Sequence, residues 1–181
     1  MAFETMTSRK EPSVKEARIF SLVLIPILGQ YVVTLEEVGG QRLIPIWIGV
    51  SEGNAIGLKL QGEALPRPMT HDLMVNLLGQ LGAKVERIVV ADLKEGTYYV
   101  VIEVATDGKR YSVDSRPSDA MALAVRMNAP IFVDDKVWKK CPVIMKPITD
   151  EEVEKFKREL QSLRPEDFFK GLAEGEGKAA P

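Results

Sequence analysis

The chain of 181 residues contains an internal similarity that constrains its fold more than any other feature. At a fixed offset of 67 and without a gap, residues 17–62 align with residues 84–129. The matched residues include Gly29 with Gly96, Tyr31 with Tyr98 and Glu36 with Glu103, and the best-matched segments are 51–60 and 118–127. Self-similarity at a fixed spacing predicts a duplicated structural unit. The alternative is that two strand-to-helix junctions share the same general chemistry.

The hydrophobic pattern predicts three strands and then a helix in each repeat. The expected strands are 19–25, 31–35, 43–48, 85–93, 98–105, 111–114 and 131–133, and the expected helices are 51–60, 70–81, 118–128 and 135–140. Two such units can pair into one curled, mostly antiparallel sheet with helices packed on it. We therefore expect an α+β domain at residues 16–146, preceded by a flexible N-terminus at residues 1–15.

The C-terminal segment differs in character from the repeats. We expect a helical extension at residues 147–170 and a disordered tail at residues 171–181. Thr149 and Glu152 form a capping box, and Pro165 is expected to end the helix. An apolar stripe at helical spacing consists of Val153, Phe156, Leu160 and Leu163. This stripe needs a surface to cover, either on the domain itself or on a neighbouring subunit, and we favour a homodimer.

Charge and the counts of two residue types exclude several classes of protein. The net charge of -2 excludes a strongly basic, histone-like nucleic-acid binder. The negative charge comes from residues 149–181, which carry nine acids and six bases, so residues 1–148 have a net charge of +1. Cys141 and His71 are the single cysteine and histidine, which excludes a disulfide framework, a Cys/His zinc site and a two-histidine mechanism within one subunit. The apolar run at residues 19–28 is too short to span a membrane. We expect a cytoplasmic protein.

A first motif lies at the start of the second expected helix. Thr70 is expected to cap this helix, with Met69 and Met74 forming a hydrophobic staple around the cap. His71 and Asp72 then occupy the first turn, where the helix dipole favours a carboxylate and disfavours a proton on histidine. We therefore expect His71 to be neutral and able to accept a proton. The alternative is that both residues only decorate a helix start.

A second motif joins a strand to an apolar helix. It contains Asp114, Ser115, Arg116, Ser118 and Asp119 within six residues. Either serine can cap the helix. An arginine beside free backbone N–H groups suits a phosphate, and the two aspartates suit a divalent cation. A capped helix with a structural Asp–Arg pair is the alternative. The first repeat has a carboxylate, Glu52, at the equivalent junction but no arginine.

Three blocks together resemble a known family: LIPIWIGVSEGNAI, RPMTHDLMVNLL and VDSRPSDAMALAVRMNAPIFV. In order and spacing they resemble the bifunctional nuclease domain family, over roughly residues 16–146. The resemblance implies an α+β domain of two repeats in one barrel-like sheet, and hydrolysis of the phosphodiester bonds of DNA and RNA. The positions that match its motifs are Glu52, Arg67, Thr70, His71, Asp72, Asp114, Ser115, Arg116, Ser118 and Asp119.

The roles of these residues are hypotheses. We expect a catalytic group of His71, Asp72, Asp114, Arg116 and Asp119. Substrate binding is expected from Arg67, Thr70, Ser115 and Ser118. A divalent metal, Mg²⁺ or Mn²⁺, is expected on Asp114, Asp119 and Glu52, with Asp72 as another candidate ligand, because one histidine cannot be both general base and general acid without changing roles. The alternative function is a non-catalytic module that binds nucleic acid or protein, in which the motif residues are structural.

Overall fold

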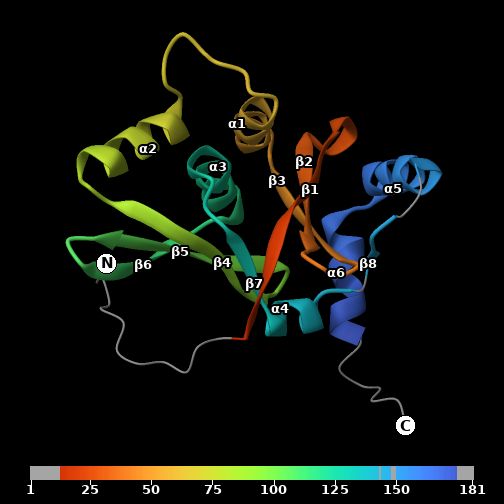
Figure 1. The fold of residues 1–181 in the computed structure, drawn as a ribbon. Coiled ribbons are helices and arrows are strands. Elements are labelled where there is room, and N and C mark those ends of the chain that lie inside the picture. Colours follow the sequence, from red (N-terminus) through yellow and green to blue (C-terminus); the bar gives the residue numbers. More distant parts are fainter. Residues whose placement is uncertain (1–12, 143, 148–149, 175–181) are drawn as a thin grey trace.

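A computed structural model describes residues 13–142, 144–147 and 150–174 of the chain as a mixed α+β fold (Figure 1). The strands are β1 (Val14–Ile25), β2 (Gln30–Glu37), β3 (Arg42–Gly49), β4 (Lys84–Lys94), β5 (Thr97–Thr106), β6 (Lys109–Ser115), β7 (Ile131–Asp134) and β8 (Ile144–Met145). The helices are α1 (Val50–Leu60), α2 (Thr70–Gln80), α3 (Pro117–Met127), α4 (Asp135–Lys140), α5 (Asp150–Ser162) and α6 (Pro165–Glu174), with a short 3₁₀ turn, η1, at Pro26–Leu28. In these ranges no helix has the length and apolarity needed to cross a bilayer.

The two halves of the sheet are built in the same order. β1, β2 and β3 form an antiparallel meander that leads into α1, and β4, β5 and β6 form another that leads into α3. The first hairpin of each half turns through a glycine with positive φ, Gly29 at 60° and Gly96 at 73°. A residue without a Cβ adopts this conformation without strain. The arrangement agrees with the repeat seen in the sequence, while common origin of the halves stays a prediction.

One short strand joins the two halves into a single sheet. The strand order is β6-β5-β4-β7-β1-β2-β3-β8, so β7 lies between the first strands of the two halves. β7 is antiparallel to β1, and it is parallel to β4. The sheet is curled, as Figure 1 shows, but within the described residues it is open, with β6 and β8 as its edges. The expected barrel-like closure is therefore absent from the described strands, because these two edges pair with their inner neighbours and not with each other.

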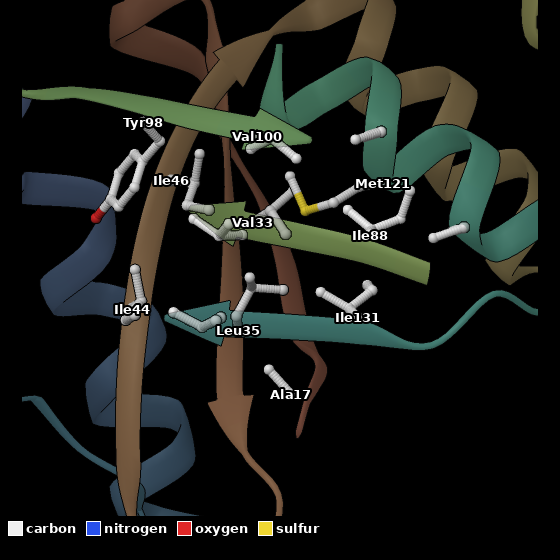
Figure 2. Packing of buried hydrophobic residues seen from close by; sticks show 14 of the residues in the cluster. Ala17, Val33, Leu35, Ile44, Ile46, Ile88, Tyr98, Val100, Met121 and Ile131 are labelled. Atoms are coloured by element: carbon white, nitrogen blue, oxygen red, sulfur yellow. The ribbon is translucent and has the colours of Figure 1, made fainter. Parts of the chain in front are cut away.

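The main core lies between the concave face of the sheet and the helices. α1 and α3 pack against each other, and α2 packs on α3. Met121 of α3 points into the middle of this core, close to Val33, Ile88 and Val100 from three strands of the two halves (Figure 2). Burial of these side chains holds α3 against strands from both halves of the sheet.

The C-terminal helices cover the other face of the first half of the sheet. Phe156 and Leu160 of α5 are buried with side chains of β1, β2 and β3. Trp47 of β3 contacts Phe168 and Phe169 of α6, with ring centroids 5.4 and 6.0 Å apart. The apolar stripe of the tail therefore covers the domain itself, which was one of the two surfaces expected for it, and the homodimer stays a prediction.

Several expected boundaries differ from those in the structure. Pro165 was expected only to end a helix, but it is also the first residue of α6, which runs to Glu174. Proline fits the first turn of a helix because no hydrogen-bond partner for its missing N–H is required there. Residues 171–174 are accordingly helical and not disordered. β1 begins at Val14, which pairs with Asp134 of β7, so residues 14–15 belong to the sheet. The capping box from Thr149 and the residues beyond 174 lie outside the described residues.

Two buried polar groups support the fold away from the helix starts. Glu37 is buried at the end of β2, where Arg42 and Lys15 donate hydrogen bonds of 2.8 and 2.6 Å to its carboxylate. These bonds hold the pKa of Glu37 at about 2, although burial opposes them. Cys141 is buried beside the hydroxyl of Tyr98, and burial raises the pKa of its thiol to about 11. Such a thiol is a poor nucleophile.

Candidate active site

The first turns of α1, α2 and α3 share one feature. Each has a carboxylate at its third helical position: Glu52 in α1, Asp72 in α2 and Asp119 in α3. A negative charge is favourable there because the N-terminal N–H groups lack partners and the helix dipole is positive at that end. The sequence placed all three residues at helix starts, and the structure shows how their side chains are used.

His71 and Asp119 form the contact that joins α2 to α3. The Nε2 atom of His71 lies 3.2 Å from Oδ1 of Asp119. Because an ionised carboxylate only accepts hydrogen bonds, Nε2 carries the hydrogen and Nδ1 is the nitrogen left to accept a proton. Burial alone would raise the pKa of Asp119, but hydrogen bonds from Arg116 and His71 outweigh it and lower this pKa. His71 is only 7% exposed, so a small part of its ring meets solvent.

Arg116 links the same carboxylate to α1. Its Nε and Nη2 atoms donate to Oδ2 and Oδ1 of Asp119 at 2.8 and 3.1 Å, and its Nη1 lies 3.1 Å from Oε1 of Glu52. The hydrogen bonds with Asp119 raise the pKa of Arg116, and Glu52 adds to this effect. Its side chain is 66% exposed. The guanidinium therefore stays charged and open to solvent between two helix starts, where it can reach an anion.

Asp72 faces a different partner. Its Oδ2 accepts a 3.0 Å hydrogen bond from the backbone N–H of Met69, and its Oδ1 accepts a 2.6 Å bond from Nε of Arg126. These two interactions, the backbone bond first, lower the pKa of Asp72. The contacts of Asp72 thus hold the start of α2 in place, and they are not directed at His71 or Asp119. These contacts are those of a helix-positioning residue, and the expected catalytic role of Asp72 stays a prediction.

Arg126 is the residue of this region that sequence reasoning missed. Its side chain is 6% exposed, and its Nη1 donates to the carbonyl oxygens of Ala55 and Ala122 at 3.1 and 3.0 Å. With Asp72 it connects α1, α2 and α3. The signal that could have found it is its position, because it aligns with Lys59 in the repeat and lies within the apolar segment after Asp119.

Two hollows flank α2 and divide the expected site residues. A groove of about 610 Å³ lies between α2 and strands β5 and β6; its walls are apolar and one end is formed by Asp114, Ser115, Arg116 and Asp119. The second hollow, of about 370 Å³, is lined by Arg67, Asp72 and Arg126 among others. Arg67 and Arg116 therefore border different hollows, and neither of these two hollows is lined by all of the expected residues.

Comparison with known proteins identifies the family. The model of the bifunctional nuclease domain matches residues 33–146. The chain belongs to the bifunctional nuclease domain family. It is 38% identical over 162 residues, 84% of this chain and 97% of the relative, to a Mycobacterium tuberculosis protein described as uncharacterized. It is 23% identical over 104 residues, 56% of this chain and 31% of the relative, to proteins named bifunctional nuclease 1 in Oryza sativa and bifunctional nuclease in Oryza minuta.

The hydroxyl groups that match the family motif have local roles. The N-cap of α2 is Met69 and not Thr70, because the first helical hydrogen bond runs from Leu73 N–H to the Met69 carbonyl and Thr70 is the first helical residue. The N-cap of α3 is Arg116, and no side chain caps it. Neither serine therefore has the expected capping role: Ser115 Oγ donates to the Arg116 carbonyl at 3.0 Å, and Ser118 is buried inside the first turn.

The family motif does not form the expected metal site in this arrangement. Within residues 13–142, 144–147 and 150–174, no three His, Cys, Asp or Glu side chains are grouped so that they could hold a metal ion. Of the expected ligands, Glu52 and Asp119 bind Arg116, and Asp114 is an exposed residue of β6. An ion on these carboxylates would have to displace Arg116 from two of them. The residues present therefore do not fit the three-carboxylate site, and a metal requirement stays a prediction.

Proposed function

We propose that this protein is a nuclease that hydrolyses phosphodiester bonds of DNA and RNA, with His71, Asp119 and Arg116 at its active site. The observation that carries the proposal is the chain of contacts from His71 through Asp119 to the exposed Arg116, at the starts of two helices. The names of the rice relatives support the same activity. We place it in the cytoplasm, where a free thiol such as that of Cys141 stays reduced.

The three side chains have complementary chemical capacities. Asp119 holds His71 in one tautomer and stabilises the imidazolium that forms when Nδ1 takes a proton from an attacking water. Arg116 and the free N–H groups at the start of α3 offset the charge that develops on the phosphate. The leaving oxygen takes its proton from His71 or from solvent. Because water is the nucleophile, the reaction needs no 2′-hydroxyl and can act on both DNA and RNA.

Substrate binding would rearrange Arg116. Its guanidinium now forms ion pairs with Glu52 and Asp119, and a phosphate would compete with these carboxylates. Bidentate binding of phosphate by arginine is strong enough to make such an exchange feasible at an exposed position. We therefore assign phosphate binding first to Arg116, and we expect Arg67, which borders the other hollow, to contribute less.

The decisive experiment is a nuclease assay on single- and double-stranded DNA and RNA, with and without EDTA. We expect Asp119→Ala and His71→Ala each to reduce the rate at least 100-fold, as for the loss of a general base or its orienting group. Arg67→Ala, purified in parallel, is the control and should keep most of the activity. Full activity of both site variants would refute the proposal, and loss of activity in EDTA would establish a metal requirement.

A second candidate function is a non-catalytic module that binds nucleic acid. The burial of His71 and the engagement of Asp72 and Asp119 in hydrogen bonds within the fold favour it. Fluorescence anisotropy with labelled single-stranded DNA separates the two functions. Binding that Arg116→Ala weakens, without cleavage by any preparation, would support the binding module.

A further inference from the structure

We propose that the apolar groove between α2 and strands β5 and β6 binds an unpaired base of DNA or RNA, next to the phosphate that Arg116 holds. The substrate class is then single-stranded nucleic acid, or the single-stranded parts of a folded one. This inference rests on the proposed nuclease function, because it gives that function a binding site for the base beside the cleaved bond. Two observations carry it: a preformed apolar groove, and a cation at one end of that groove.

The first observation is that the groove has apolar walls on two sides. Leu77 and Leu81 are spaced one helical turn apart on α2 and line one wall. Ile102 of β5 and Val113 of β6 are opposite each other in the ladder, so their side chains lie on the same face of the sheet and line the other wall. The volume of about 610 Å³ is within the range of roughly 300–1,000 Å³ that is typical of small-ligand sites. Enzymes that bind an unstacked base hold it between apolar side chains of this kind.

Contacts at both ends of α2 hold the groove open. His71 at the start of this helix lies 3.2 Å from Asp119 of α3, and Thr106 Oγ1 of β5 donates to the Leu81 carbonyl at 3.4 Å. These contacts fix α2 relative to the sheet, so the groove exists before a ligand binds. Between them Leu77 is 54% exposed, and Leu81 is 73% exposed. Exposed apolar side chains around a preformed hollow mark a binding site.

The second observation is the charge at one end of the groove. The polar residues that line it come from the segment 114–119, in which Arg116 is the cation. The guanidinium is 66% exposed, so a phosphate can reach it. A nucleotide has the matching arrangement, because an anionic phosphate is joined through a sugar to a flat and largely apolar ring. The groove is therefore complementary to a nucleotide in both charge and polarity.

Two carboxylates at the same end explain why the base has to contribute to binding. Asp119 already pairs with Arg116, and Asp114 is exposed and repels a phosphate. The attraction between Arg116 and a phosphate is therefore largely offset, and phosphate contacts alone should hold nucleic acid weakly. Burial of the base in the groove supplies the remaining affinity. We expect binding to depend less on salt than binding that phosphate contacts govern.

A groove of this kind selects single strands. Each base of a duplex is paired and stacked, so its entry into the groove requires removal from the stack, which costs free energy. An unpaired base avoids most of this cost. Because apolar walls form no hydrogen bonds, they do not read the sequence, and purines should bind better than pyrimidines since their larger rings bury more apolar area.

The test is fluorescence anisotropy of the full chain with three labelled probes: a single-stranded oligonucleotide, the same sequence as a duplex, and a single strand of abasic sugar–phosphate units. A gel run after each measurement checks that the probe is intact. We expect the single strand to bind at least tenfold more tightly than either of the other two, since it alone has a base free to enter the groove. Arg116→Ala should weaken the binding of all three probes.

Two variants of α2 test the groove itself. Leu77→Gln should weaken single-strand binding about fivefold and leave the binding of the abasic strand unchanged, because it makes part of an apolar wall polar. Leu73→Gln is the matched control: Leu73 is on the same helix and is 52% exposed, but it is not among the described residues that line the groove. If Leu77→Gln lowers the Tm, Leu81→Gln offers a more exposed position in the same wall.

The outcomes separate this inference from the proposed nuclease function. Single-strand binding that Leu77→Gln weakens, without cleavage by any preparation, would support the groove and refute the nuclease. Equal binding of the base-containing and abasic strands, or equal effects of Leu77→Gln and Leu73→Gln, would overturn the groove even if the protein cleaves nucleic acid. A second copy of the chain as the occupant would appear as a change of mass in solution caused by Leu77→Gln, with oligonucleotide binding unchanged, and this result would overturn the proposal too.

Discussion

Replacement of Arg126 by methionine tests whether one buried guanidinium holds the three helix starts together. The change removes a 2.6 Å bond to Asp72 and two bonds to backbone carbonyls at 3.1 and 3.0 Å. A hydrogen bond to a charged group contributes about 1.5–3 kcal/mol and a neutral one about 1 kcal/mol. Asp72 is 36% exposed, so water can replace part of the lost hydrogen bond, and we take its contribution from the lower end of the range for charged groups. The expected loss is about 2–4 kcal/mol, or a Tm lower by roughly 5–15 °C for a chain of this size.

The assay is urea and thermal unfolding followed by circular dichroism, with Lys59→Met as the matched control. Lys59 aligns with Arg126 in the repeat but is exposed, so its replacement should cost less than about 0.5 kcal/mol. Arg126→Lys keeps the charge without the planar fork and should fall between the two. Equal stability of Arg126→Met and Lys59→Met would refute the reasoning, because the buried contacts would then contribute nothing to the free energy of unfolding.

Three further predictions concern other parts of the fold. The pKa of Glu37 in the folded protein, about 2, lies below the ordinary value of 4.5, so the stabilisation by its carboxylate is present above pH 4.5 and is lost as the pH falls towards 2. Glu37→Gln should therefore make the midpoint of urea unfolding depend less on pH between 4.5 and 2. Gly53→Ala should lower the stability of the protein to thermal unfolding by about 1–3 kcal/mol, because the new Cβ would lie 2.2 Å from the ring of Tyr31. Gly79→Ala has open space around it and should raise the stability by about 0.5–1 kcal/mol. Cys141 should react with a thiol reagent only when the protein unfolds, and rapid labelling of the native protein would contradict its burial.

The strand and helix pattern was predictable because it depends on local periodicity. Every strand and helix expected within residues 19–140 is present, with ends shifted by a few residues. The place of β7 between the two halves was not predictable, since four residues can pair with several neighbours and only the assembled core decides. The start of α6 at Pro165 was missed because a proline can both follow one helix and begin another.

The candidate site was predictable as a set of residues but not as a geometry. His71 and Asp119 were both expected, yet they are 48 positions apart, and their contact depends on how α2 packs on α3. Asp114 and Asp119 are close in sequence, but one is on an edge strand and the other is inside a helix turn, so proximity along the chain did not give a shared ligand set. Arg126 was missed because a single arginine near a helix end is usually solvent-exposed.

The position of β7 has a consequence for how the chain acquires its fold during synthesis. The first strands of the two halves, β1 and β4, do not pair with each other; both pair with β7, whose residues 131–134 are made after all six strands of the meanders. A nascent chain that ends before Ile131 can form the two three-stranded meanders, but it lacks the strand that pairs with both of them. The joining of these sheets therefore awaits a late, non-local event, and such events slow folding and leave strand edges open to misassembly in the meantime.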